Sequence, residues 1–318
     1  MATNDYKIKA RLQKDWNWMV AVYLFLGGVG SGAYVVGAIA GFIGWPNIAK
    51  VGIVISLPAV LIGSLFLMAH LGTPGHSYLA PSRMKSSWIS RGVLFLSLFM
   101  LFSFIHIIDV FTGVLGGAVK VISVIALMSA VGTMVYTGAL LSASKGVPFW
   151  RSGIMPILFM FSALVTGLSA VLVIAYAGFS SSIPDAVSLK LALTAIGLLV
   201  GEAIIVFFFL HSALRLPESR DPAIIMMQKA SFIYGDLIFG LLVPFVLMLI
   251  VTSLKGGGST PAYMIVAGIL ALLGGMLLRF AIISVGMVPS LNISGFEFRL
   301  QTKPTPKPAI GKVPPGNI

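Results

Sequence analysis

Residues 15–34 read DWNWMVAVYLFLGGVGSGAY, in which two tryptophans lead into an apolar run and the run leads into Gly27, Gly28, Gly30 and Gly32. In a soluble protein this glycine spacing would suggest a nucleotide-binding turn, but such a turn follows a β-strand. Here the glycines lie within an apolar run longer than about 18 residues, which is typical of a membrane helix. Gly28 and Gly32 form a G-x-x-x-G pair, and small residues at this spacing let two helices approach closely in lipid. We therefore interpret these glycines as helix-packing positions.

The composition of the whole chain is that of an integral membrane protein. Of its 318 residues, 58% are hydrophobic and only 9% are charged, and the mean hydropathy is +1.03. Soluble domains carry about 25% charged residues. A cleaved signal peptide is not expected, because residues 1–15 are polar and the apolar run after them is too long. The chain has no cysteine, so we expect it to hold no iron–sulfur cluster, since these clusters are bound by thiolates.

Apolar windows of about 20 residues predict an all-α polytopic membrane protein with eight transmembrane helices, arranged as two four-helix bundles. The predicted spans are residues 16–44, 49–72, 89–113, 117–143, 152–178, 188–213, 232–254 and 261–286. They divide the chain into a polar N-terminal segment (1–15), a membrane domain (16–286) and a Pro- and Lys-rich C-terminal tail (287–318). The composition of the tail favours an extended strap over a helix.

The net charge of +12 is distributed unevenly and predicts the topology, not binding to nucleic acid. With eight spans both termini lie on one side of the membrane, which we call the basic face. Sixteen of the 21 Lys and Arg residues fall there: Lys7, Lys9, Arg11, Lys14, Arg83, Lys85, Arg91, Lys145, Arg151, Arg215, Arg220, Lys229, Arg299, Lys303, Lys307 and Lys312. The far face carries Lys50, Lys120, Lys190 and Lys255. The positive-inside rule then places both termini in the cytoplasm. A docking surface for an acidic partner subunit would produce the same bias.

Ionisable residues inside predicted spans are costly in lipid and are therefore candidate functional residues. Four are found: Asp109, Glu202, Asp236 and Arg279. Asp236 and Arg279 are expected at similar depth, so they can simply neutralise each other. Glu202 has no polar neighbour on its own helix that would explain it structurally, which favours a functional role.

Helix direction and a rise of about 1.5 Å per residue place these side chains in layers. Close to the basic face the predicted layer contains Tyr23, His70, Tyr136, His211, Asp236 and Arg279. Such a layer is suited to binding a polar head group, although histidines at helix ends are often structural. Asp236, Glu202, His106 and Asp109 follow at increasing depth, as in a proton pathway. His70 and His211 are the candidate axial ligands of a haem, but the chain has only four histidines and we do not predict one.

Several stretches together resemble the NrfD/polysulfide reductase membrane-subunit (PsrC-like) family. They are DWNWMVAVYLFLGGVGSGAY (15–34), HLGTPGHSYLAPSRMKSSWISRG (70–92), VYTGALLSASKGVPFW (135–150), MPILFMFSALVTG (155–167), GLLVGEAIIV (197–206) and LLGGMLLRFAII (272–283). The resemblance covers nearly the whole chain, and the shared order of the stretches is more specific than any one of them.

The resemblance implies a subunit of a respiratory oxidoreductase complex in the cytoplasmic membrane of a bacterium or archaeon. Members of the family bind menaquinone or ubiquinone and hold no haem or iron–sulfur cluster. Their partners are an iron–sulfur electron-transfer subunit and, through it, a molybdopterin or multihaem catalytic subunit. The family's quinone site matches Tyr23 and Tyr136 here, with Trp18, His70, Asp236 and Arg279 around it, and Glu202 matches an acid linked to proton transfer. The alternative is a proton- or ion-coupled transporter, but we find no inverted repeat or pair of broken helices.

Overall fold

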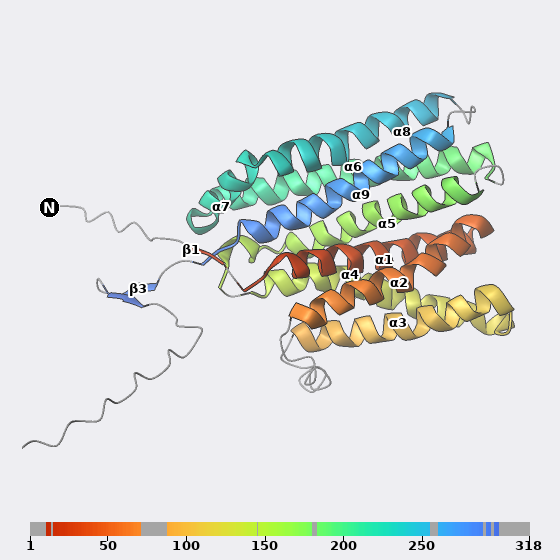
Figure 1. Cartoon of the computed structure of the whole chain (residues 1–318), viewed down its shortest axis with the longest axis horizontal. Coiled ribbons are helices and arrows are strands. Elements are labelled where there is room, and N and C mark those ends of the chain that lie inside the picture. Colours follow the sequence, from red (N-terminus) through yellow and green to blue (C-terminus); the bar gives the residue numbers. More distant parts are fainter. Residues whose placement is uncertain are drawn as a thin grey trace, which may run out of the picture.

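Eight helices of the computed structural model are long and apolar enough to cross a membrane, which confirms the predicted all-α polytopic fold (Figure 1). The structure describes residues 11–13, 15–70, 88–144, 146–179, 183–254, 260–288, 291–293 and 296–298. The spanning helices are α1 (Trp18–Phe42), α2 (Pro46–His70), α3 (Trp88–Thr112), α4 (Val119–Ser142), α5 (Met155–Phe179), α6 (Asp185–Arg215), η5 (Ser231–Leu242) continued by α8 (Val243–Leu254), and α9 (Thr260–Ser284). Each predicted boundary lies within three residues of the observed one.

Much of the predicted N-terminal segment, the tail after residue 298 and most of the family-like stretch 70–92 lie outside the described residues. Five of the basic residues assigned to the basic face are described with their side chains: Arg91, Arg151, Arg215, Arg220 and Lys229. Short elements at this face and at the far face connect the spans. They are η2 (Gly116–Ala118), η3 (Pro148–Trp150) and α7 (Pro217–Gln228).

The spanning helices pack as two groups of four, as predicted. Helices α1 to α4 contact one another in the first bundle, and α5, α6, η5–α8 and α9 do so in the second. The two bundles meet mainly where α1 packs on α5, and these two helices run side by side through the middle of the molecule (Figure 1).

The crossing of α1 and α5 depends on glycine. A Cβ atom added to Gly32 would overlap the carbonyl group of Ala163, and one added to Gly167 would overlap the backbone of Gly32. Gly28 also faces Ala163, with 3.4 Å between its notional Cβ and the Ala163 Cβ. The interpretation of the glycines in the opening stretch as helix-packing positions is therefore confirmed.

Replacing Gly32 with alanine should destabilise the protein by about 1–3 kcal/mol, because the added methyl group forces α1 away from α5. The measurement is the thermal unfolding midpoint in detergent. Gly41→Ala is the matched control on the same helix, since its Cβ would lie 3.6 Å from the Ala49 Cβ, an ordinary contact. Equal midpoints for the two variants would contradict the close crossing.

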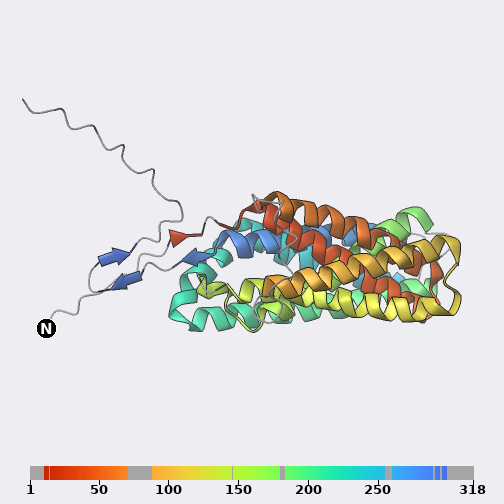
Figure 2. The same cartoon turned by 90° about the horizontal axis from the view of Figure 1, so that it is seen from below.

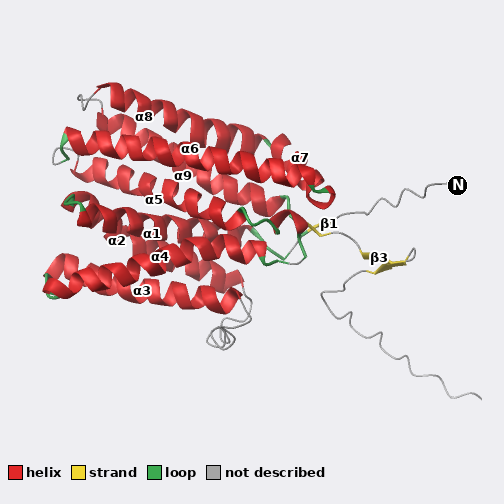
Figure 3. Ribbon diagram, turned by 180° about the vertical axis from the view of Figure 1, so that it is seen from behind, coloured by secondary structure: helices red, strands yellow, loops and turns green. Residues whose placement is uncertain are grey.

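Two short antiparallel strand pairs, which the sequence analysis did not predict, lie at the basic face. β1 (Arg11–Leu12) pairs with β2 (Met287–Val288), and β3 (Leu291–Ile293) pairs with β4 (Phe296–Phe298). The first pair joins the segment before α1 to the segment after α9, beyond one end of the helices (Figures 2 and 3). The Gln13 side chain supports this join by donating to the carbonyls of Trp16 and Ile283 at 2.8 and 3.1 Å.

The seventh span begins as a π-helix, η5, and becomes α-helical at Val243. Pro244 follows at once, and because it has no N–H it interrupts the regular α-helical hydrogen-bond pattern. The span stays close to α9 in this region, since a Cβ on Gly240 would lie only 2.5 Å from the Gly274 Cα. π-helical turns often occur at functional sites, and this one holds Asp236 in a buried position.

Candidate functional site

A buried arginine lies where the two bundles meet. Arg279 is 1% exposed, and its guanidinium reaches from α9 to both α1 and α5. Nε donates to the Leu24 carbonyl at 3.2 Å, and Nη1 donates to Ser162 Oγ at 2.9 Å and to the Gly275 carbonyl at 2.6 Å. The face of the guanidinium also packs near the rings of Phe25 and Phe159. Arg279 therefore links three helices through neutral acceptors.

Two buried carboxyl groups accompany Arg279. Glu202 on α6 is 2% exposed and Asp236 on η5 is 1% exposed. Both interact electrostatically with Arg279, and Glu202 also interacts with the Ser162 hydroxyl and with Asp236. The hydrogen bonds of the guanidinium nevertheless go to the three neutral acceptors. The predicted neutralisation of Asp236 by Arg279 is thus an interaction within a group of three charges, which we call the buried triad: Glu202, Asp236 and Arg279.

Most of the unsatisfied buried polar atoms in the described part of the protein gather here. Five side-chain N or O atoms are buried without a hydrogen-bond partner, and four of them are Tyr23 OH, Glu202 Oε1, Asp236 Oδ2 and Arg279 Nη2. The fifth, Thr260 Oγ1, lies at the first residue of α9 at the far face. Buried polar groups are normally paired, and leaving one unpaired costs about 1–3 kcal/mol. A group of four on four elements indicates a region built to meet water or a polar ligand.

A pair of tyrosines lies next to this region in the first bundle. Tyr23 of α1 is 1% exposed and Tyr136 of α4 is 4% exposed, and their phenol groups are close enough to interact. The Tyr23 hydroxyl still has no hydrogen-bond partner among the described residues. The Tyr136 ring lies against Gly92 of α3, where any Cβ atom would overlap it. A glycine on α3 thus makes room for a tyrosine of α4.

The predicted layer near the basic face is found for four of its members. Tyr23 is five residues inside its helix, Asp236 is five residues inside η5, Arg279 is five residues before the end of α9, and Tyr136 is six before the end of α4. At about 1.5 Å per residue, these positions lie roughly one and a half turns below the basic face. Glu202 is 13 residues before the end of α6 and contacts the same group from a deeper level.

The other predicted residues near the basic face lie at the edge of this region or outside it. His70 is the half-buried last residue of α2. Trp18 is 52% exposed and packs edge-on against Phe66. His211 is exposed on α6, where it stacks on Phe207. Lys229 follows α7 and donates to Ser284 Oγ at 2.7 Å, and burial lowers the pKa of its ammonium group.

The far end of the predicted proton pathway lies in the other bundle. His106 is buried in the first bundle and shares a hydrogen bond of 2.7 Å between its Nδ1 and the Tyr34 hydroxyl. Asp109 accepts a 2.7 Å hydrogen bond from the Leu115 N–H and so caps the turn after α3. The structure therefore brings Asp236 and Glu202 together, and it places His106 and Asp109 in a separate polar group.

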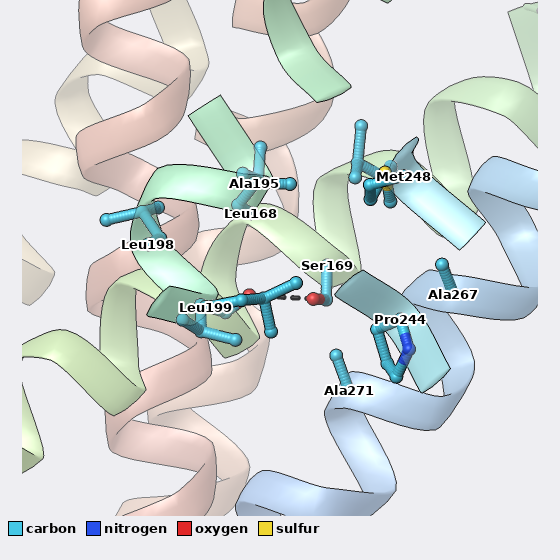
Figure 4. A pocket seen from close by; sticks show the side chains of 11 residues that line it. Leu168, Ser169, Ala195, Leu198, Leu199, Pro244, Met248, Ala267 and Ala271 are labelled. Atoms are coloured by element: carbon cyan, nitrogen blue, oxygen red, sulfur yellow. Dashed lines mark hydrogen bonds between the residues drawn. The ribbon is translucent and has the colours of Figure 1, made fainter. Parts of the chain in front are cut away.

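A small cavity lies deeper in the second bundle (Figure 4). Its volume is about 10 Å³, close to the minimum for one water molecule. Ser169 is the polar side chain in its lining, which is otherwise formed by apolar residues of α5, α6, α8 and α9. The Ser169 hydroxyl donates to the Val165 carbonyl at 2.7 Å. The cavity is far too small for a cofactor-sized ligand, and it lies on the far-face side of the buried triad.

Three residues of the site escaped the sequence analysis. Ser162 accepts from Arg279, Gly28 leaves space for Arg279 Nη2 at 2.8 Å from its notional Cβ, and Gly92 leaves space for Tyr136. Gly28 was predicted only as a packing residue, and Ser162 looks like one of many hydroxyls in apolar helices. Spacing within one helix cannot reveal such partners, because each acts on a side chain of another helix. Among the described residues, no three His, Asp or Glu side chains are grouped to hold a metal ion.

Comparison with known proteins covers nearly the same stretch as the membrane domain. A family model described as polysulphide reductase, NrfD matches residues 8–289. The protein is similar to one of the subunits of polysulfide reductase from Wolinella succinogenes, with 28% identity over 190 residues, or 52% of the present sequence and 60% of that subunit. It is also similar to protein NrfD of Escherichia coli, with 28% identity over 309 residues, or 86% of the present sequence and 95% of that protein. An NrfD homolog of Haemophilus influenzae is 27% identical over 311 residues, or 86% of the present sequence and 94% of that protein. The match to the Wolinella subunit thus spans less than two thirds of that relative, whereas the NrfD matches span almost all of theirs.

Proposed function

The chain belongs to the polysulphide reductase NrfD family, and on that basis we propose that it is the quinone-reactive membrane subunit of a respiratory oxidoreductase complex. The observation that carries the proposal is the group of unsatisfied buried atoms next to the Tyr23–Tyr136 pair. The Wolinella relative is by name one lettered component of polysulfide reductase, which supports an enzyme of several subunits. In this proposal the present protein exchanges electrons between the quinone pool and a partner.

The residues of the site fit a quinone head group. A quinone carries two carbonyl oxygens and, once reduced, two hydroxyls, so it needs hydrogen-bond donors and acceptors at the end of an apolar passage. Tyrosine hydroxyls both donate and accept, and the Tyr23 hydroxyl has no partner within the described protein. Tyr23 and Tyr136 would hold the head group, with His70 and Trp18 at the edge near the basic face.

The bound quinone supplies two-electron, two-proton redox chemistry, and this protein supplies the proton-handling groups. Tyr23 and Tyr136 orient the oxygens and pass protons at their hydroxyl atoms. Asp236 and Glu202 lie behind them, so we propose that these acids exchange protons with the tyrosines. His106 and Asp109, which belonged to the expected pathway, are not included because they form a different group with Tyr34 and Leu115.

The electrons require a partner, because this protein has no cysteine to bind an iron–sulfur cluster. We propose an iron–sulfur electron-transfer subunit that contacts the basic face, and through it a molybdopterin or multihaem catalytic subunit. The tyrosines lie near that face, which shortens the distance to a cluster. We further propose that the protein lies in the cytoplasmic membrane of a prokaryote with its basic face, and so both termini, in the cytoplasm.

Purification of the protein from native membranes in mild detergent tests this proposal. We expect mass spectrometry to find a cysteine-rich iron–sulfur protein bound to it, and solvent extraction to release about one quinone per molecule. A protein that purifies alone and without quinone would contradict the proposal and favour the transporter alternative.

Replacing Gly92 with alanine should lower quinone-linked turnover by roughly ten- to a hundredfold, because a displacement of about 1 Å at a reacting group can cost about 10²-fold. The added methyl group overlaps the Tyr136 ring, which must move. Gly197→Ala on α6 is the control, since its Cβ would meet no atom within 4 Å. Quinol oxidation by membranes that contain each variant measures the effect, and unchanged turnover in Gly92→Ala would show that the ring position is unimportant.

A further inference from the structure

The buried triad has one positive and two negative groups. Arg279, Glu202 and Asp236 are each at most 2% exposed. The other charged side chains of α6 lie near its ends and are exposed: Asp185, Lys190 and Arg215. Those of α7 are exposed as well, and α8 has none among its described residues. If both acids were ionised, the interior would hold an uncompensated negative charge, which costs several kcal/mol in a low-dielectric medium.

The hydrogen bonds around Ser162 distinguish the two acids. Ser162 Oγ accepts from Arg279 Nη1 at 2.9 Å, and a hydroxyl has one proton left to donate. The side chain that interacts with this hydroxyl is Glu202. The series of bonds from Arg279 through Ser162 to Glu202 therefore stabilises an ionised Glu202 carboxylate.

Asp236 is in a different position. Its Oδ2 has no partner among the described residues, and the charges that face it are Glu202 of α6 and Arg279 of α9. We propose that Asp236 carries a proton in the resting protein, while Glu202 is ionised and balances Arg279. The triad is then neutral and holds one transferable proton.

The surroundings of the triad give this proton one open direction. On the far-face side, an apolar layer of Val165, Leu199, Leu241 and Ala271 closes the second bundle. Behind the layer lies the small cavity at Ser169 (Figure 4). On the other side are the unsatisfied hydroxyl of Tyr23 and the basic face. Use of the proton at the tyrosine pair rests on the proposed function, whereas the protonation of Asp236 does not.

Infrared difference spectroscopy of the whole purified protein in detergent, without added quinone, tests the assignment. A protonated carboxyl group gives a C=O stretching band that shifts in D₂O. We expect this band at neutral pH, and we expect it to move to lower frequency in protein labelled with ¹³C at the aspartate side-chain carboxyl. Labelling the glutamate side-chain carboxyl should leave it in place. Both samples are wild-type, so the result does not depend on a variant that folds.

Substitutions add a second readout. Asp236→Asn should remove the band. Glu202→Gln should remove it too, because Asp236 must then ionise to balance Arg279. Asp109→Asn, which keeps the oxygen that caps the turn after α3, should leave the band unchanged.

Three results would overturn the assignment: no protonated-carboxyl band, a band that moves with the glutamate label, or a band that persists in Glu202→Gln. Quinone binding is measured separately by extraction. A band of the expected kind in a protein that binds no quinone would therefore contradict the proposed function and leave the protonation of Asp236 intact.

Discussion

Replacing Tyr136 with phenylalanine should lower quinone-linked turnover of the complex by about 10²-fold or more, the size expected for loss of a proton-transferring group. The substitution removes one oxygen and keeps the ring that packs against Gly92. Activity with a soluble redox dye that reacts directly with the catalytic subunit should remain, because it bypasses the membrane subunit. The two activities are measured on the same membranes.

Tyr34→Phe is the matched control for this experiment. Tyr34 is also a fully buried tyrosine of the first bundle, but its hydroxyl bonds to His106 Nδ1 on the far-face side. We expect Tyr34→Phe to keep quinone-linked turnover within about twofold of wild type, since surrounding packing is unchanged and a lost hydrogen bond typically costs only about 1 kcal/mol of stability. If Tyr136→Phe loses dye-linked activity to the same extent, the subunit assembly has failed and Tyr136 is not assigned to the quinone site. Equal losses in Tyr34→Phe and Tyr136→Phe would remove the distinction on which the site rests.

The sequence predicted the fold well because lipid imposes simple rules. Each span must be long, apolar and helical, so the eight helices and their ends could be located from composition alone. The same rules gave the layer of Tyr23, Tyr136, Asp236 and Arg279, since depth follows from helix direction and a fixed rise per residue. The glycine spacing at Gly28 and Gly32 likewise predicted a close crossing.

Depth does not determine which helices are neighbours, and there the predictions were less informative. His106 and Asp109 lie at suitable depths for a pathway from Glu202, but they belong to the first bundle, and Glu202 belongs to the second. The amphipathic helix α7 was read as a connection because Pro217 and Pro222 and four charged residues hide its apolar side. The strands β1 and β2 are only two residues long, and such pairs have no periodicity to detect.

Replacing Arg279 with leucine should reduce the free energy of unfolding by about 3–5 kcal/mol, the usual cost of removing one partner from a buried charged group. Glu202 and Asp236 lose their counter-charge, and the Leu24 carbonyl and the Ser162 hydroxyl lose a donor. The measurement is unfolding of the detergent-solubilised protein by increasing fractions of SDS, followed by circular dichroism.

The triple variant Arg279→Leu, Glu202→Gln, Asp236→Asn separates charge from packing. It contains the same leucine but has no buried charge left, and replacing a whole buried ionic group is often neutral or stabilising even where removing one member is costly. We expect it to recover most of the stability that Arg279→Leu loses. If the triple variant is as unstable as the single one, Arg279 stabilises the junction of the two bundles by its contacts with α1 and α5, and its charge matters little. Recovery would instead mean that the two acids are kept in the interior at a cost that the fold does not require. A cost of that kind is expected where buried acids serve proton transfer and not stability.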